Sequence, residues 1–152
     1  MPETLVPVSD FSPAKARLSE LMTAVFHGHQ PQLVSRHHGK EQMLLVRPDD
    51  LVAMLADRVL RVEATYDAGE VTLAIPEMGL LGFGETFDEA ADDLLEELRA
   101  YAVRFFEQPA LFLASSRAGH AAAILRFALT PPELQRDLLL EFKTTADLPT
   151  SG

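Results

Sequence analysis

The chain has 152 residues, of which 47% are apolar, and this share is too high for a disordered protein. It contains no cysteine, which excludes disulfides and thiolate metal sites and is typical of the reducing cytoplasm. Its apolar runs are far shorter than the roughly 20 residues that cross a bilayer, and its acidic N-terminus lacks the layout of a signal peptide. We therefore expect a cytoplasmic protein that has no membrane partner.

The formal net charge of −10 is unevenly distributed along the chain. Residues 11–47 hold five basic and two acidic side chains, together with four of the five histidines. Residues 85–97 hold seven carboxylates and no basic residue. This asymmetry predicts different partners for the N-terminal third of the chain and for the remainder.

The N-terminal third has the pattern of a small mixed unit. The expected elements are a strand, a helix, the two strands of a hairpin and a second helix, over residues 4–8, 12–28, 32–36, 42–46 and 49–57. Ser12 and Pro13 form a helix start, and Gly28 marks the helix end. The hairpin turn is expected at residues 38–40.

From residue 60 onward the pattern restarts. The expected elements are two strands, an irregular glycine-containing loop, a long helix and two further helical stretches, over residues 60–66, 71–75, 77–84, 87–106, 111–129 and 131–142. Thr86 and Glu89 have the spacing of a capping box, and the helix behind them carries its acids opposite an apolar face. Residues 144–152 are expected to form a loose tail.

Several short motifs follow one another in the N-terminal third. They are a short first strand, a Leu-Ser pair in the helix, a V-S-R-x-x-G hairpin turn and a P-x-x-L helix start, found in VSDFSPAKARLSELM and PQLVSRHHGKEQMLLVRPDDLVAM. This order resembles the N-terminal domain of the Phd/YefM antitoxin family. The resemblance implies a dimer that places basic residues of the first helix and the hairpin on operator DNA. Lys15 and Arg36 match those positions, and Lys15 replaces the usual arginine with a point donor.

The predicted DNA-binding residues surround these two positions. They are the basic and histidine side chains Lys15, Arg17, Arg36, His37, His38 and Lys40. Arg36 is expected to reach a base edge from the hairpin tip, and its neighbours are expected to reach phosphates. The alternative is that these charges are only solvated, as exposed lysine and arginine usually are. The dimer contact is expected in or near the side chains of Val6, Val8, Leu33 and Leu44.

A second set of motifs lies in VTLAIPEMGLLGFGETFDEAADDLLEEL. A strand runs into I-P-E, a glycine loop follows, and G-E-T-F-D-E-A opens the long helix. This segment resembles the HicB-like antitoxin fold. In it, glycine turns the chain, threonine caps the helix, glutamate closes the capping box, and alanine packs against the sheet.

The expected fold class is α+β. We expect a Phd/YefM-like dimerisation and DNA-binding domain, a HicB-like domain, a helical C-terminal segment and a flexible tail, over residues 1–58, 59–107, 108–143 and 144–152.

Three further groups of residues are of types found in metal sites or phosphate-binding loops, but their spacing does not match such sites. They are the glycines Gly79, Gly82 and Gly84, the histidines His27, His29, His37 and His38, and the carboxylates Asp67, Glu70, Glu77 and Glu85. The glycines do not form G-x-G-x-x-G and precede an acidic helix, so they are interpreted as turn residues. The histidines have neither cysteine nor a suitably spaced acid for zinc. A carboxylate metal site of a hydrolase is the weakest alternative, and we expect no cofactor and no enzyme activity.

Both resemblances imply a type II antitoxin that binds a co-encoded toxin, of RelE/ParE type, and represses its own operon as a homodimer or higher homo-oligomer. An acidic protein with an apolar helix suits the cationic RNA site of such a toxin. The predicted toxin-binding stripe comprises Leu134, Leu138, Leu139 and Phe142. The alternative for this helix is packing on its own domain. The alternative function is a HicB-like ligand-binding or scaffold protein in which the N-terminal unit serves only for dimerisation.

Overall fold

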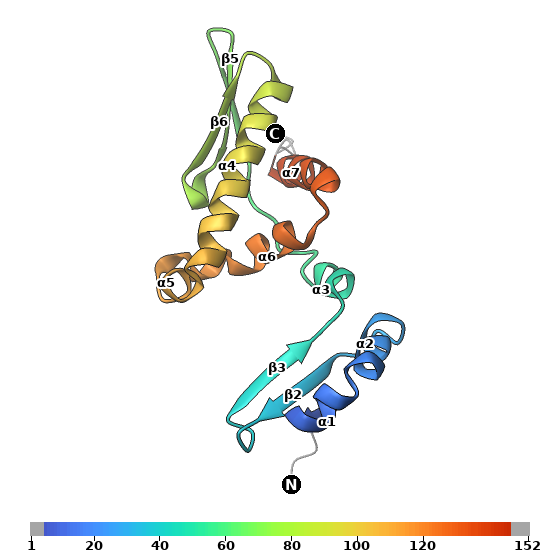
Figure 1. Cartoon of the computed structure of the whole chain (residues 1–152). Helices are drawn as coiled ribbons and strands as arrows, with labels where there is room; N and C mark the ends of the chain where they lie inside the picture. The colour runs from blue at the N-terminus through green and yellow to red at the C-terminus, as the bar shows by residue number, and fades with distance from the viewer. Residues whose placement is uncertain (1–4, 147–152) are drawn as a thin grey trace. The chain divides into compact units, whose positions relative to one another are not determined.

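The computed structural model describes residues 5–146, and the side chains of residues 5–141. The chain forms two compact units that divide between Met54 and Leu55. Each unit combines a three-stranded sheet with helices, so the predicted α+β class is confirmed (Figure 1). Within the described part, no helix is both long and apolar enough to cross a membrane.

The first unit is built on a mixed sheet of order β1-β2-β3. Its elements in chain order are β1 (Val8–Asp10), α1 (Phe11–Ala16), α2 (Leu18–Phe26), β2 (Gln32–Arg36), β3 (Glu41–Leu45) and α3 (Pro48–Met54). Strand β1 pairs in parallel with β2, and β2 pairs antiparallel with β3. The predicted hairpin is therefore confirmed, whereas the first strand begins later than expected because Val8 is the residue that pairs with Leu33.

The single helix expected over residues 12–28 is two helices. Arg17 separates them, because its backbone (φ −120°, ψ 28°) leaves the helical region. Asp10, rather than Ser12, is the N-cap residue of α1. The apolar spacing that predicted the helix begins only at Leu18, so it carried no information about the preceding turn.

The first unit buries little apolar surface. Among its described side chains, only Ala14 and Val25 are buried hydrophobic residues. Large apolar side chains with exposed fractions of 39% or more are numerous: Leu5, Val8, Phe11, Leu18, Met22, Phe26, Met43, Leu44 and Met54. A unit of this size with such a small core is expected to need a partner surface for stability.

The second unit has an antiparallel sheet of order β4-β5-β6, with α4 packed against it and the later helices packed against α4. Its elements are β4 (Glu63–Asp67), β5 (Glu70–Ile75), the 3-10 helix η1 (Pro76–Met78), β6 (Leu80–Gly84), α4 (Phe87–Glu107), α5 (Pro109–Leu113), the 3-10 helix η2 (Ser116–His120), α6 (Ala121–Leu129) and α7 (Pro132–Ala146). The core contains side chains from the sheet, α4, α6 and α7, and Leu73, Ile75, Leu94, Leu98, Tyr101, Ile124, Phe127 and Leu139 are almost fully buried.

The irregular loop expected over residues 77–84 is wrong, because most of it is the strand β6. Leu80 and Gly82 are buried on the face toward α4, while Leu81 and Phe83 alternate with them on the opposite face. A Cβ on Gly82 would lie 2.4 Å from the backbone nitrogen of Leu94, which real Cβ atoms do not approach. Gly82 is therefore a packing residue, and its interpretation as a turn residue is wrong.

The start of α4 follows the capping prediction. The Glu89 backbone N–H donates to the Thr86 hydroxyl oxygen at 3.1 Å, and the Glu85 backbone N–H donates to the Glu89 carboxylate at 2.9 Å. The predicted apolar face is also confirmed, since Ala91, Leu94, Leu98, Tyr101 and Phe105 are all buried. The cap and this face together fix the helix against the sheet.

The C-terminal segment is more broken than expected. The continuous stretch predicted over residues 111–129 is divided into α5, η2 and α6. Ser115 lies at the first break, where its hydroxyl donates to the Phe112 carbonyl at 2.7 Å and accepts from the Arg117 N–H at 3.1 Å. The Ser115 hydroxyl thus satisfies backbone groups that a continuous helix would pair with each other. Helix α7 reaches Ala146, and the rest of the predicted tail lies outside the described residues.

Candidate functional site

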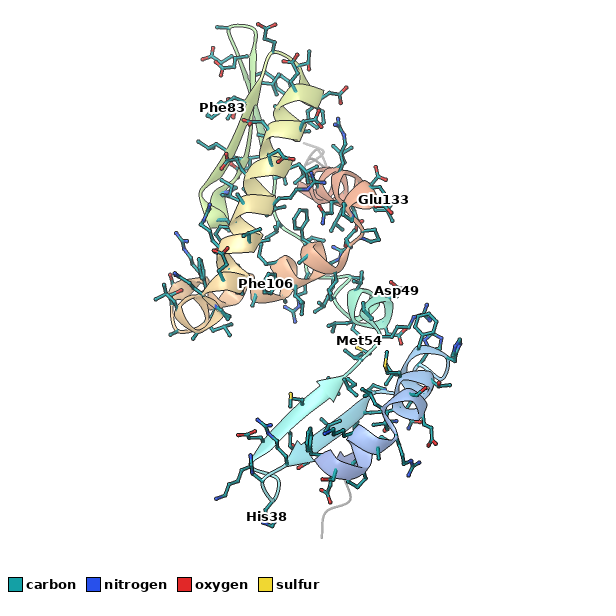
Figure 2. The ribbon with its side chains drawn as sticks, viewed as in Figure 1. His38, Asp49, Met54, Phe83, Phe106 and Glu133 are labelled. Carbon is teal, nitrogen blue, oxygen red and sulfur yellow. The ribbon has the colours of Figure 1, made fainter. Side chains whose placement is uncertain are left out.

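The tip of the β2–β3 hairpin is a tight turn with an unusual backbone. The Lys40 N–H donates to the His37 carbonyl at 3.2 Å. His37, His38 and Gly39 have φ values of 53°, 56° and 82°. Only glycine adopts this left-handed region without cost, and histidine is tolerated there more often than most residues. Figure 2 shows His38 at the free end of the hairpin, where its side chain is exposed.

Arg36 and Glu41 flank this turn as a register pair. Their side chains form an ion pair, and they are 46% and 49% exposed. An ion pair this exposed contributes at most about 1 kcal/mol, so a stronger anionic ligand can replace Glu41 at the guanidinium.

The tip and the start of α1 line an open pocket of about 980 Å³. Its lining residues are Asp10, Phe11, Ser12, Pro13, Ser35, Arg36, His37, His38, Lys40 and Glu41. Four of the six predicted DNA-binding residues therefore lie together here, namely Arg36, His37, His38 and Lys40. Lys15 and Arg17 do not line the pocket, although both are exposed, and Arg17 pairs with Glu20 at 3.0 Å.

The remaining histidine pair lies elsewhere. His29 Nδ1 contacts the Asp50 carboxylate oxygens at 2.9 and 3.0 Å, near the beginning of β2 rather than at the hairpin tip. In the part of the chain that the structure describes, no three metal-ligating side chains come together.

Arg47 has a structural position that the sequence did not reveal. Its guanidinium carbon lies 4.5 Å from the centre of the Phe26 ring, and its Nη2 pairs with Asp49 at 3.3 Å. The side chain is only 23% exposed. Arg47 thus links the end of α2 to the start of α3, unlike the exposed cations at the hairpin tip.

An apolar row crosses the first sheet. Val8 pairs with Leu33, and Leu33 pairs with Leu44, so the three side chains lie side by side on one face. Val8 is 39% exposed and Leu44 is 54% exposed. Three of the four residues expected at the dimer contact form this row.

The acids of α4 have several different partners. Arg136 of α7 bridges Asp88, at 2.8 Å, and Asp92. Arg99 pairs with Glu96 at 2.9 Å. The Asp93 carboxylate accepts the backbone N–H of Phe83 at 2.8 Å. Part of the acidic run therefore stabilises the second unit.

The predicted toxin-binding stripe on α7 is largely covered by its own unit. Leu138 and Leu139 are 7% and 1% exposed and belong to the core, whereas Leu134 is 49% exposed. The Phe142 side chain lies outside the described residues. Toxin binding through this stripe stays a prediction that requires α7 to leave the core.

Of the carboxylates considered as a metal site, three lie at one end of the second sheet and one lies at the other end. Asp67 and Glu70 flank the β4–β5 turn, Glu85 follows β6, and Glu77 lies in η1 at the opposite end of β5.

A buried polar contact joins α4 to η2. The Tyr101 hydroxyl and His120 Nδ1 are 3.0 Å apart, and the Arg117 guanidinium carbon lies 5.8 Å from the centre of the Tyr101 ring. Burial raises the pKa of the Tyr101 hydroxyl, and Arg117 and Arg104 oppose this shift in part.

Comparisons with known proteins cover most of the chain. The profile of the PHD-like family, described as "Antitoxin of toxin-antitoxin, RelE / RelB, TA system", matches residues 5–137. A crystal structure of the antitoxin part of a candidate toxin/antitoxin system from Syntrophomonas wolfei subsp. wolfei is similar in fold, with a TM-score of 0.77. The two chains are 20% identical, and the similarity covers 88% of this chain and 96% of the other. None of the curated proteins compared with the chain matches it. Since the family profile spans nearly all described residues of both units, the chain belongs to the PHD-like family of toxin–antitoxin antitoxins.

Proposed function

We propose that this antitoxin neutralises a co-encoded RelE/ParE-type RNase toxin by direct binding, and that it represses its own operon by binding operator DNA as a homodimer. The family match over residues 5–137 carries this proposal. In it, the first unit acts as a Phd/YefM-like DNA-binding module, and the second acts as a HicB-like module toward the toxin.

The distribution of side chains in the first unit supports DNA binding. The hairpin tip gathers Arg36, Lys40 and two histidines around one pocket. Lys15 and Arg17 add exposed cations from the neighbouring helices. Such a cluster suits phosphate contacts, and a side chain at the tip of a hairpin can enter a DNA groove.

The apolar row of the first sheet supports dimerisation. Val8, Leu33 and Leu44 form a neutral strip on a unit whose buried hydrophobic residues, among those described, are only Ala14 and Val25. Covering this strip with its copy would remove apolar surface from water, which stabilises association. A dimer would also duplicate the hairpin tip, as a palindromic operator requires.

Two measurements on the full chain test the proposal. A mobility shift with the DNA upstream of its own gene is expected to show binding that weakens as salt rises, because phosphate contacts release counterions. If an adjoining reading frame encodes a small basic protein that arrests growth, co-expression of this chain with it is expected to restore growth. DNA binding without rescue would overturn neutralisation, and rescue without DNA binding would overturn autorepression.

A further inference from the structure

In the described part of the second unit, helix α4 packs on one face of the sheet and leaves the other face exposed. Helix α4 packs on the face that carries Leu73 and Leu80. On the opposite face, strand register forms two rows, Glu63–Ala74–Leu81 and Thr65–Thr72–Phe83. Leu81 and Phe83 are 47% and 48% exposed. We call these two rows the outer face.

The segment that carries this face has only one sign of charge. Between Val62 and Leu98 the chain contains eleven carboxylates and no lysine, arginine or histidine. Glu63 lies within the outer face, and Asp67, Glu70 and Glu85 lie at the ends of its strands. Arg61 pairs with Glu63 at 3.3 Å from the flanking chain. The outer face is therefore a partly apolar patch that holds one carboxylate, which is paired with Arg61, and it has an acidic rim.

One backbone amide at the edge of β6 is already used. The Phe83 N–H would otherwise be free at this edge, but it donates to the Asp93 carboxylate. A partner strand cannot use this amide for sheet extension, which is a common protection of edge strands. This bond disfavours sheet extension at Phe83, whereas Leu81 and Phe83 are exposed on the outer face.

We infer that the outer face of the β4–β5–β6 sheet binds the cationic surface of the co-encoded toxin, with Leu81 and Phe83 as its apolar anchors. This inference rests on the proposed neutralisation. Two copies of the chain would bring acidic rims together, whereas a basic partner would meet opposite charge. In most interfaces, a few large side chains surrounded by a polar rim contribute most of the binding energy.

The test uses the full chain and an inactive variant of the toxin encoded by the adjoining reading frame, with affinity measured by titration calorimetry. The double variant Leu81→Ser/Phe83→Ser is expected to bind the toxin about tenfold or more weakly than wild type. Leu113→Ser is the matched control, because Leu113 is 54% exposed on α5. It is expected to bind as wild type does. Circular dichroism and thermal melting report on folding.

A second variant keeps the test decisive if the serine pair unfolds. Thr72→Arg adds a cation at the centre of the outer face, between Thr65 and Phe83. It is expected to weaken toxin binding by at least about tenfold without altering DNA binding.

The outcomes separate the inference from the proposed function. No binding by wild type would overturn neutralisation itself, and with it the inference. Wild-type affinity in a folded outer-face variant would overturn the inference alone. A loss of toxin affinity only in Leu134→Ser would also overturn the inference, because it would place the contact on α7. A change from dimer to monomer in the outer-face variants would assign the face to a second copy and also overturn the inference.

Discussion

Gly82 of β6 lies directly against the backbone of Leu94 in α4. A Cβ at position 82 would stand 2.4 Å from the Leu94 nitrogen and 2.5 Å from the Ala90 carbonyl oxygen. Gly84 makes a similar approach, since its Cβ would stand 2.6 Å from the Ala90 nitrogen. The absence of side chains at two strand positions thus sets the distance between helix and sheet. The sheet that α4 holds in this way carries the outer face on its opposite side.

Gly82→Ala is therefore expected to destabilise the second unit by about 1–3 kcal/mol or more, because neither backbone can move without disturbing the core. Gly119→Ala is the matched control, since a Cβ there meets nothing within 4 Å and its φ lies outside the positive region. Urea unfolding followed by circular dichroism measures both. Equal stability of the two variants would show that α4 can retreat from the sheet at no cost.

The same glycines show where sequence reasoning about the fold fails. The strands of the β2–β3 and β4–β5 hairpins were predictable because their apolar and polar residues lie between turn residues. Strand β6 was not, because Gly82 and Gly84 replace the buried apolar residues that alternation requires, and glycine is also the commonest turn signal. Glycines that allow close packing and glycines that turn the chain look alike until the opposing helix is known.

The candidate sites were predictable to a similar extent. The position of Arg36 beside the hairpin turn follows from the local pattern, and the structure brings it together with Lys40. Its pairing with Glu41 follows from strand register, which the local sequence pattern does not define to the residue. The sequence does not predict the burial of Leu138 and Leu139, because an apolar helical stripe has the same spacing whether it meets its own core or a partner.

Leu44→Asp is expected to reduce dimerisation. It places a charge in the apolar row beside Leu33, and an unpaired charge is costly in a dry contact. Sedimentation velocity at micromolar concentration is expected to show a dimer for wild type and mostly monomer for the variant. Leu113→Asp, at a similarly exposed position of the second unit, is expected to remain a dimer. A wild-type monomer, or a dimeric Leu44→Asp, would contradict the proposed contact.

Arg36→Ala is expected to reduce operator affinity by about 1–3 kcal/mol if the guanidinium reads a base edge, and to relax sequence preference. Glu41→Gln is expected to act in the opposite direction, by about two- to fivefold, because it releases Arg36 from its ion pair and removes a charge that repels phosphate.

Lys15→Ala is expected to weaken binding to all sequences and to reduce the salt slope by about one. Mobility shifts at several salt concentrations measure these effects. Unchanged affinity in an Arg36/Lys15 double alanine variant would exclude this surface.

Tyr101 gives the second unit a predictable response to alkaline pH. Burial raises the pKa of its hydroxyl in the folded state above the value of about 10 in the unfolded chain. The neutral hydroxyl therefore contributes its full stability below pH of about 10. This contribution is lost as the pH rises toward the folded-state pKa, since the unfolded chain then releases the proton first.

Tyr101→Phe cannot ionise, although it loses the contact with His120, which is worth about 1 kcal/mol. Urea unfolding between about pH 8 and pH 11 is expected to show wild type as the more stable protein at the lower pH, with its advantage shrinking above pH of about 10. Because the variant retains every other titrating group, the difference between the two curves isolates Tyr101. Curves that stay parallel across this range would show that the folded protein gives up this proton as readily as the unfolded chain.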